Sequence, residues 1–164
     1  VLARLNILGL KVPRWARRWK EPGEPFIRPR DYPAGSVCAA SVHDTSTLRH
    51  WWEREADRPA FWEALGCEGA APSDYSPSTA RRIMRALLAA ASNLVTFQLQ
   101  DCFALDDALR VADPEEERVN TPGTVDQLNW TYRMPFRLED LRKNKQLLEI
   151  LGALTAERRS RRTG

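Results

Sequence analysis

Residues 36–52 read SVCAASVHDTSTLRHWW, and the rest of the chain can be interpreted as support for this segment. The run from Val37 to Val42 is short, small and partly β-branched, which is typical of a strand buried on both faces. Thr45 or Ser46 can then cap a helix whose apolar residues begin at Leu48. A strand, a short polar connection and a helix together predict one βα unit.

The polar connection in this unit contains the adjacent pair His43 and Asp44. In parallel α/β folds the loops that follow the strands converge on one mouth, and catalytic side chains collect there. The pair is therefore a candidate for a functional site. A second interpretation is open from the residues alone, because Asp44 can also be a simple capping carboxylate that accepts backbone N–H bonds.

The remaining pattern predicts an α/β chain rich in helices. Two further strands are expected at 10–12 and 93–98, and the second of them runs into Leu99-Gln100-Asp101 much as the central strand runs into its polar pair. A helix that begins near Pro77, capped by Ser76 or Ser78, has a wide apolar face. A last amphipathic helix is expected over 138–154, and the polar basic tail 156–164 is expected to fray.

Composition excludes several classes of protein. Lys and Arg number 25 against 22 Asp and Glu, so the formal charge is only +3 and does not by itself predict a nucleic-acid partner. Three cysteines lie far apart with no C-x-x-C, which signals neither a disulfide framework nor zinc. The two histidines are too few for a His-rich metal site, and their spacing does not form one with the cysteines. No metal or organic cofactor is implied.

No run of residues approaches the roughly 18 apolar residues of a membrane helix. Arg4 and Lys11 interrupt the apolar residues at the start, so the layout of a signal peptide is missing. A cytoplasmic protein is therefore the default expectation.

Two long connections are unusual enough to be functional. Residues 13–33 hold Trp15 and Trp19 among basic residues, which favours either a carbohydrate-facing loop or a loop folded over its own core. Residues 110–135 contain Pro122-Gly123, a type II turn signal, because Pro fixes the first central φ and Gly tolerates the positive second one. This polar segment can also be a plain solvated surface loop.

Three motifs carry a resemblance to a known family. VHDTSTLRHWW at 42–52, RVNTPGT at 118–124 and NWTYRMP at 129–135 resemble, in order and spacing, the C-terminal part of the 4-α-glucanotransferases called amylomaltases or disproportionating enzymes. The resemblance runs from about Leu8 to about Leu154. That family is similar to the α-amylases in using a (β/α)8 barrel and a retaining mechanism.

The resemblance implies that residues 1–155 form the C-terminal segment of a (β/α)8 TIM barrel with about three parallel strands. A whole barrel needs about 200 residues or more, so the 164 residues are expected to be a piece of a longer enzyme. The nucleophilic Asp and the acid Glu of the family lie upstream of this segment. The isolated chain is therefore expected to be inactive and to need the N-terminal remainder of the same enzyme.

The resemblance also implies roles for individual residues. Asp44 matches the carboxylate that stabilises the oxocarbenium-like transition state, and His43 matches its neighbouring hydrogen-bond donor. Further substrate-binding residues are expected at Asn120, Asn129, Trp130 and Asp101. The implied substrates are malto-oligosaccharides and α-1,4-glucans, with no nucleic acid or membrane as partner. The chain departs from the family at Val42, where Thr is common, and at Gln98, which replaces a Pro.

Two other classes of function stay open. One is a non-catalytic carbohydrate-binding or scaffold module. The other is a helical nucleic-acid-binding module, suggested by Arg81-Arg82 and by the Arg158 to Arg162 cluster. A salt-sensitive gel shift would support this last class.

Overall fold

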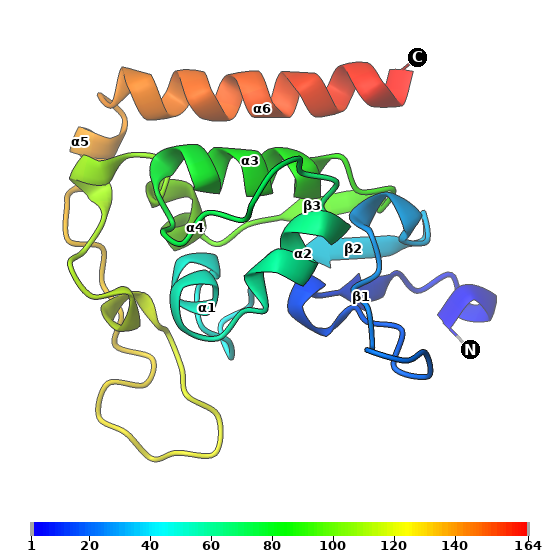
Figure 1. Cartoon of the computed structure of the whole chain (residues 1–164). Helices are drawn as coiled ribbons and strands as arrows, with labels where there is room; N and C mark the ends of the chain where they lie inside the picture. Colours follow the sequence, from blue (N-terminus) through cyan, green and yellow to red (C-terminus); the bar gives the residue numbers. More distant parts are fainter. Residues whose placement is uncertain (1, 164) are drawn as a thin grey trace.

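The computed structural model describes residues 2–163 and is built on a parallel sheet in the order β1-β2-β3 (Figure 1). The strands are β1 (Gly9–Lys11), β2 (Ser36–Ala39) and β3 (Leu94–Thr96). Each of these strands overlaps a segment that was predicted to be a strand. The prediction of a mixed α/β chain with three parallel strands is confirmed.

The central strand is shorter than the predicted run to Val42. The Thr45 hydroxyl accepts a hydrogen bond from Val42 N at 3.1 Å and donates one to Val42 O at 2.9 Å. Both polar groups of the Val42 backbone are therefore used by a turn and are not available to a neighbouring strand. The third strand ends early for a related reason, because Gln98 already caps the next helix.

The described residues contain six α-helices: α1 (Leu48–Arg54), α2 (Arg58–Ala64), α3 (Pro77–Leu88), α4 (Leu99–Phe103), α5 (Leu138–Leu141) and α6 (Lys145–Thr163). Short 3-10 turns complete the connections: η1 (Leu2–Leu5), η2 (Pro13–Trp15), η3 (Pro29–Asp31), η4 (Asp107–Leu109) and η5 (Pro114–Glu117). Within residues 2–163 no helix has the length and apolar character needed to cross a membrane.

The C-terminal part differs from the expected single helix and frayed tail. Asn144 starts a new helix by accepting a hydrogen bond from Leu147 N at 2.9 Å, so α5 and α6 are separate. Helix α6 then continues to Thr163 and packs on α3, which lies between it and the sheet (Figure 1). Glu157 pairs with Arg85 of α3 at 2.9 Å, and this contact holds residues that composition alone predicted to be free in solvent.

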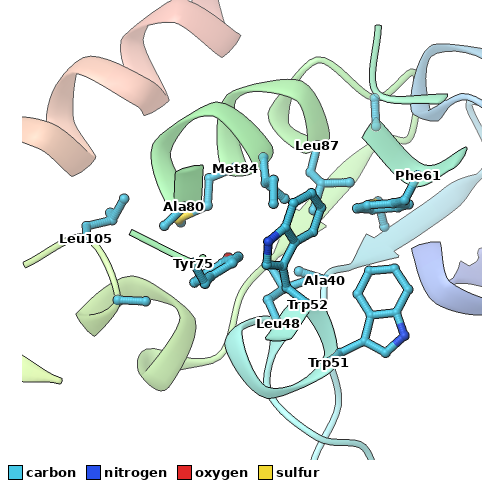
Figure 2. Packing of buried hydrophobic residues seen from close by; sticks show 14 of the residues in the cluster. Ala40, Leu48, Trp51, Trp52, Phe61, Tyr75, Ala80, Met84, Leu87 and Leu105 are labelled. Carbon is cyan, nitrogen blue, oxygen red and sulfur yellow. The ribbon is translucent and has the colours of Figure 1, made fainter. Parts of the chain in front are cut away.

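Aromatic side chains from α1 fill the core. Trp52 is 1% exposed, and its ring centroid lies 5.8 Å from that of Trp62 and 6.4 Å from that of Tyr75. Figure 2 shows Trp52 pointing between α3 and Tyr75, with Trp51 beside Phe61. Because such rings bury a large apolar area, α1 is fixed firmly at its position after β2.

One face of the sheet remains uncovered by the described residues. Leu10, Val37 and Leu94 are register partners, so their side chains form one row on the same face. Leu10 is 59% exposed and Leu94 is 54% exposed. The next residue of the central strand, Cys38, points to the opposite face and is completely buried. The helices therefore cover one face and leave an apolar row on the other.

Candidate functional site

His43 and Asp44 occupy the turn that connects β2 to α1. His43 Nε2 lies 3.2 Å from Asp44 Oδ2, and about half of each side chain is accessible to solvent. Because the three strands are parallel, this turn lies at the edge of the sheet where all three strands end. The pair therefore combines a fixed position with an open surface.

Helix α1 is capped by another residue. Thr47 Oγ1 accepts a hydrogen bond from His50 N at 3.3 Å and is the N-cap of α1. The interpretation of Asp44 as the helix cap is therefore wrong, and the cap expected at Thr45 or Ser46 moves to Thr47. The contacts that the structure gives to the Asp44 oxygens are with side chains.

A distant segment of the chain meets this pair. Asn120 Nδ2 donates a hydrogen bond of 2.7 Å to Asp44 Oδ1. Trp130 places its ring centroid 5.1 Å from that of His43, with 42° between the planes. Four of the six predicted site residues, His43, Asp44, Asn120 and Trp130, are thus brought together. Each Asp44 oxygen has a neighbouring side chain, and the carboxylate has a defined orientation.

Asn129 lies behind these contacts and shapes the loop. Its Oδ1 accepts a bond from Thr121 N at 2.9 Å, and its Nδ2 donates to the carbonyl and hydroxyl oxygens of Thr124, both at 3.2 Å. Between the two threonines, Gly123 has a φ of +78°, as the Pro-Gly turn signal predicted. Asn129 therefore braces the turn that follows Asn120.

This arrangement predicts the effect of Asn129→Ala. The change removes three hydrogen bonds that close the turn, so Asn120 loses its fixed direction toward Asp44. We expect the rate constant of any reaction that depends on Asp44 to fall by about tenfold, which corresponds to about 1.4 kcal/mol of barrier. Steady-state kinetics of the full-length protein measure this. Val125→Ala, at a fully exposed position of the same loop, is the control, and an equal loss in both variants would contradict the bracing role.

Asp101 differs from the other predicted site residues because it is buried and 1% exposed. Ser41 Oγ donates to its Oδ2 at 2.5 Å, and Leu48 N donates to its Oδ1 at 2.9 Å. Burial raises the pKa of this carboxyl, while these hydrogen bonds and the charge of Arg14 oppose the shift. The structure places Asp101 beneath the turn and surrounded by protein donors.

A buried ion pair that sequence reasoning missed holds the distant segment in place. Arg49 Nη1 lies 3.2 Å from Glu117 Oε1, and Thr47 Oγ1 donates to Glu117 Oε2 at 3.0 Å. Arg49 also donates to the carbonyls of Val111 and Ala112 at 2.7 and 3.1 Å. Burial raises the pKa of Glu117, and the charge of Arg49 opposes this shift. Helix α1 thus anchors the segment that continues to Asn120.

The available signal for this pair was weak. Arg49 lies close to the apolar residues Leu48, Trp51 and Trp52, which is a hint of a buried charge. Glu117 is the last of three consecutive glutamates, and nothing in the sequence separates it from its exposed neighbours Glu115 and Glu116.

Trp15 and Trp19 in the first long connection are 54% and 58% exposed. The same connection is nevertheless attached to the core, since Phe26 is buried and contacts Trp51 and Phe61. The two tryptophans are therefore free to meet a ligand, and their contact with sugar stays a prediction.

The sequence of this chain matches a known protein family. Residues 1–139 match the sequence model of a family described as 4-alpha-glucanotransferase. The 4-alpha-glucanotransferase DPE2 of Oryza sativa subsp. japonica is 33% identical over 149 residues, which cover 90% of this chain and 15% of the rice protein. The 4-alpha-glucanotransferase of Chlamydia muridarum is 33% identical over 159 residues, which cover 93% of this chain and 29% of that protein.

Solved structures agree with this at the level of the fold. An amylomaltase from Streptococcus agalactiae in complex with acarbose matches 96% of this chain with a TM-score of 0.68 and 21% identity, over 28% of that structure. The amylomaltase from Corynebacterium glutamicum matches 93% of this chain with a TM-score of 0.57 and 16% identity, over 26% of that structure. The chain thus spans less than a third of the length of the relatives it matches.

Proposed function

Since the chain belongs to the 4-alpha-glucanotransferase family, we propose that it is the C-terminal part of a (β/α)8 catalytic barrel that transfers α-1,4-glucan segments between malto-oligosaccharides. Its three parallel strands and its match to a quarter or more of two amylomaltase structures support this placement. In this proposal the preceding part of the same enzyme supplies the other strands.

The observation that carries the proposal is the held carboxylate of Asp44. Its two oxygens face His43 at 3.2 Å and Asn120 at 2.7 Å, at the end of a strand and open to solvent. A fixed carboxylate stabilises the flattened, positively charged sugar ring of the transition state more than the ground state. Its oxygens can also accept hydrogen bonds from sugar hydroxyls. Asp44 is therefore assigned as the transition-state stabiliser, with His43 as a neighbouring donor.

The bond-making groups belong to the preceding part of the enzyme. A retaining transfer needs a nucleophilic carboxylate and a carboxylic acid about 5 Å apart. The nucleophile bonds to the anomeric carbon while the glycosidic bond breaks and the acid protonates the departing oxygen. The hydroxyl oxygen of the acceptor glucan then bonds to the anomeric carbon and displaces the nucleophile. The proton of that hydroxyl passes to the residue that acted as the acid in the first step. Asp44 takes part in neither proton transfer.

The uncovered face of the sheet supports the need for this partner. The row of Leu10, Val37 and Leu94 is apolar, and two of its members are more than half exposed. The outer edges of β1 and β3 have no neighbouring strand within residues 2–163. Closing a barrel pairs such edges and fills the interior with side chains in layers. We therefore assign the row to the barrel interior.

The full-length protein incubated with maltotriose tests the proposal. We expect glucose together with chains longer than maltotriose, while the total concentration of reducing ends stays constant, because transfer replaces one glycosidic bond with another. A rise in reducing ends without longer chains would show a hydrolase and contradict the proposal.

The 164-residue chain alone provides a second readout in the same assay. We expect no transfer from it, and activity would mean that the nucleophile and the acid lie within these residues. A full-length protein that binds malto-oligosaccharides without converting them would instead support the carbohydrate-binding alternative.

A further inference from the structure

One buried carboxylate connects the ends of two strands and the start of α1 beneath the candidate site. Asp101 Oδ2 accepts hydrogen bonds from Ser41 Oγ at 2.5 Å and from Gln98 N at 3.3 Å, and its Oδ1 accepts from Leu48 N at 2.9 Å. Ser41 follows β2, Gln98 follows β3, and Leu48 begins α1. A single side chain therefore holds three segments of the chain in one arrangement.

Two of these contacts bracket the turn that carries the site. Ser41 stands immediately before residues 42–47, and Leu48 stands immediately after them. Within the bracket, Arg14 from η2 donates to both oxygen atoms of Ser46, at 2.7 and 2.8 Å. The turn is thus fixed at its two ends by Asp101 and additionally at Ser46 by Arg14. His43 and Asp44 are the exposed residues between these attachments.

We infer that Asp101 is a positioning residue, which sets the orientation of Asp44 through Ser41 and Leu48 and does not itself touch the substrate. This inference rests on the proposed function and replaces the expected substrate contact of Asp101. The burial of Asp101 supports it, because a side chain that is 1% exposed and already accepts three hydrogen bonds has no free oxygen surface for sugar hydroxyls.

The chemistry of the carboxylate suits this task. All three partners donate, so the residue must accept three times, and an ionised carboxylate has acceptor sites in several directions. An amide of the same size has one acceptor oxygen and one NH2 group. In Asp101→Asn at least one of the donors from Ser41, Leu48 or Gln98 would face another donor. At least one of the three hydrogen bonds would then be lost, while the volume of the side chain is kept.

The first experiment compares Asp101→Asn with the wild type in the full-length protein. We expect kcat for transfer from maltotriose to fall about 10- to 100-fold, since displacement of a catalytic group by about 1 Å has effects of this size. KM should change by less than about threefold, because the substrate loses no direct contact. Thermal unfolding measured beside the kinetics gives the folded fraction, so kcat is expressed per folded molecule. Asp107→Asn, on an exposed side chain paired with Arg110, is the matched control and should leave kcat unchanged.

The second experiment asks whether the effect passes through Asp44. In an Asp44→Asn background, Asp101→Asn should lower the residual kcat by less than about twofold, because the group being positioned is already absent. An undiminished effect in that background would overturn the inference. Ser41→Ala removes only the hydrogen bond from Ser41 to Asp101, and it should lower kcat by about 3- to 10-fold. This variant tests the inference if Asp101→Asn does not fold.

The outcomes separate this inference from the proposed function. No transfer by the wild-type protein would refute the function itself. An active wild type with an inactive Asp44→Asn and a fully active, folded Asp101→Asn would refute the positioning role alone.

Discussion

Replacement of Asp44 by Asn is expected to lower kcat for the proposed glucan transfer by about a hundredfold to a thousandfold, the range seen when one group that stabilises transition-state charge is removed. The substitution is nearly isosteric, and Asp44 is half exposed, so the fold should stay intact. Asn120 can still donate to the remaining amide oxygen, which keeps the loop close. The loss therefore isolates the charge of the carboxylate from its shape.

The measurement is the initial rate of glucose release from maltotriose by the full-length protein, together with a thermal unfolding curve. Asp74→Asn makes the same change of charge on an exposed side chain outside the 42–47 turn and the 118–130 loop, and it should leave the rate unchanged. Turnover near the wild-type value in Asp44→Asn would remove Asp44 from the mechanism.

The largest expected effect on stability comes from Arg49→Ala. Only 9% of the Arg49 side chain and 5% of the Glu117 side chain are exposed. Removing the guanidinium leaves a buried carboxylate without its charge partner and leaves two carbonyls without their donor. Breaking a buried pair in this way costs about 3–5 kcal/mol. We expect the urea midpoint of the full-length protein to fall accordingly.

Helix α1 offers a matched control for this experiment. Arg54 pairs with Asp113 at 2.8 Å, but 48% of each side chain is exposed. Arg54→Ala should therefore cost no more than about 1 kcal/mol. Similar losses of unfolding free energy in the two variants would mean that Arg49 is not specifically required to anchor the 111–118 segment.

The placement of His43 and Asp44 was predictable because it depends on local pattern. A small β-branched run followed by capping residues and an apolar helix fixes a βα unit, and parallel strands fix the side of the sheet on which the turn lies. The partner of Asp44 was not predictable in this way. Asn120 is 76 positions away, and no periodicity relates the two residues. Resemblance to the family was the only indication that they share a site.

Asp44 and Asp101 show the limit of the same reasoning. Both follow a predicted strand, so the pattern treats them alike. The difference arises from Gln98, whose side chain and backbone form a capping box with Asp101 and turn that carboxylate inward. The turn after the central strand has no such box, because Thr45 accepts from Val42 N and Thr47 accepts from His50 N, and Asp44 faces outward.

The basic end of the chain was misjudged for a comparable reason. A run of arginines is usually solvated, and composition alone gives no reason to bury one of its members. In the structure Arg158 donates to the carbonyls of Leu88, Ala90, Ser92 and Asn93, where α3 ends and the chain turns into β3. These carbonyls lie between 65 and 70 positions earlier in the chain.

This contact has a consequence for the order of events on the ribosome. The corner between α3 and β3 is synthesised several seconds before Arg158, at translation rates of about 5–20 residues per second. Until Arg158 leaves the exit tunnel, these carbonyls lack the guanidinium donors that the folded structure gives them. The corner therefore acquires these hydrogen bonds only after residue 158 has emerged, and a nascent chain halted before that residue is expected to be cleaved by proteases at this corner.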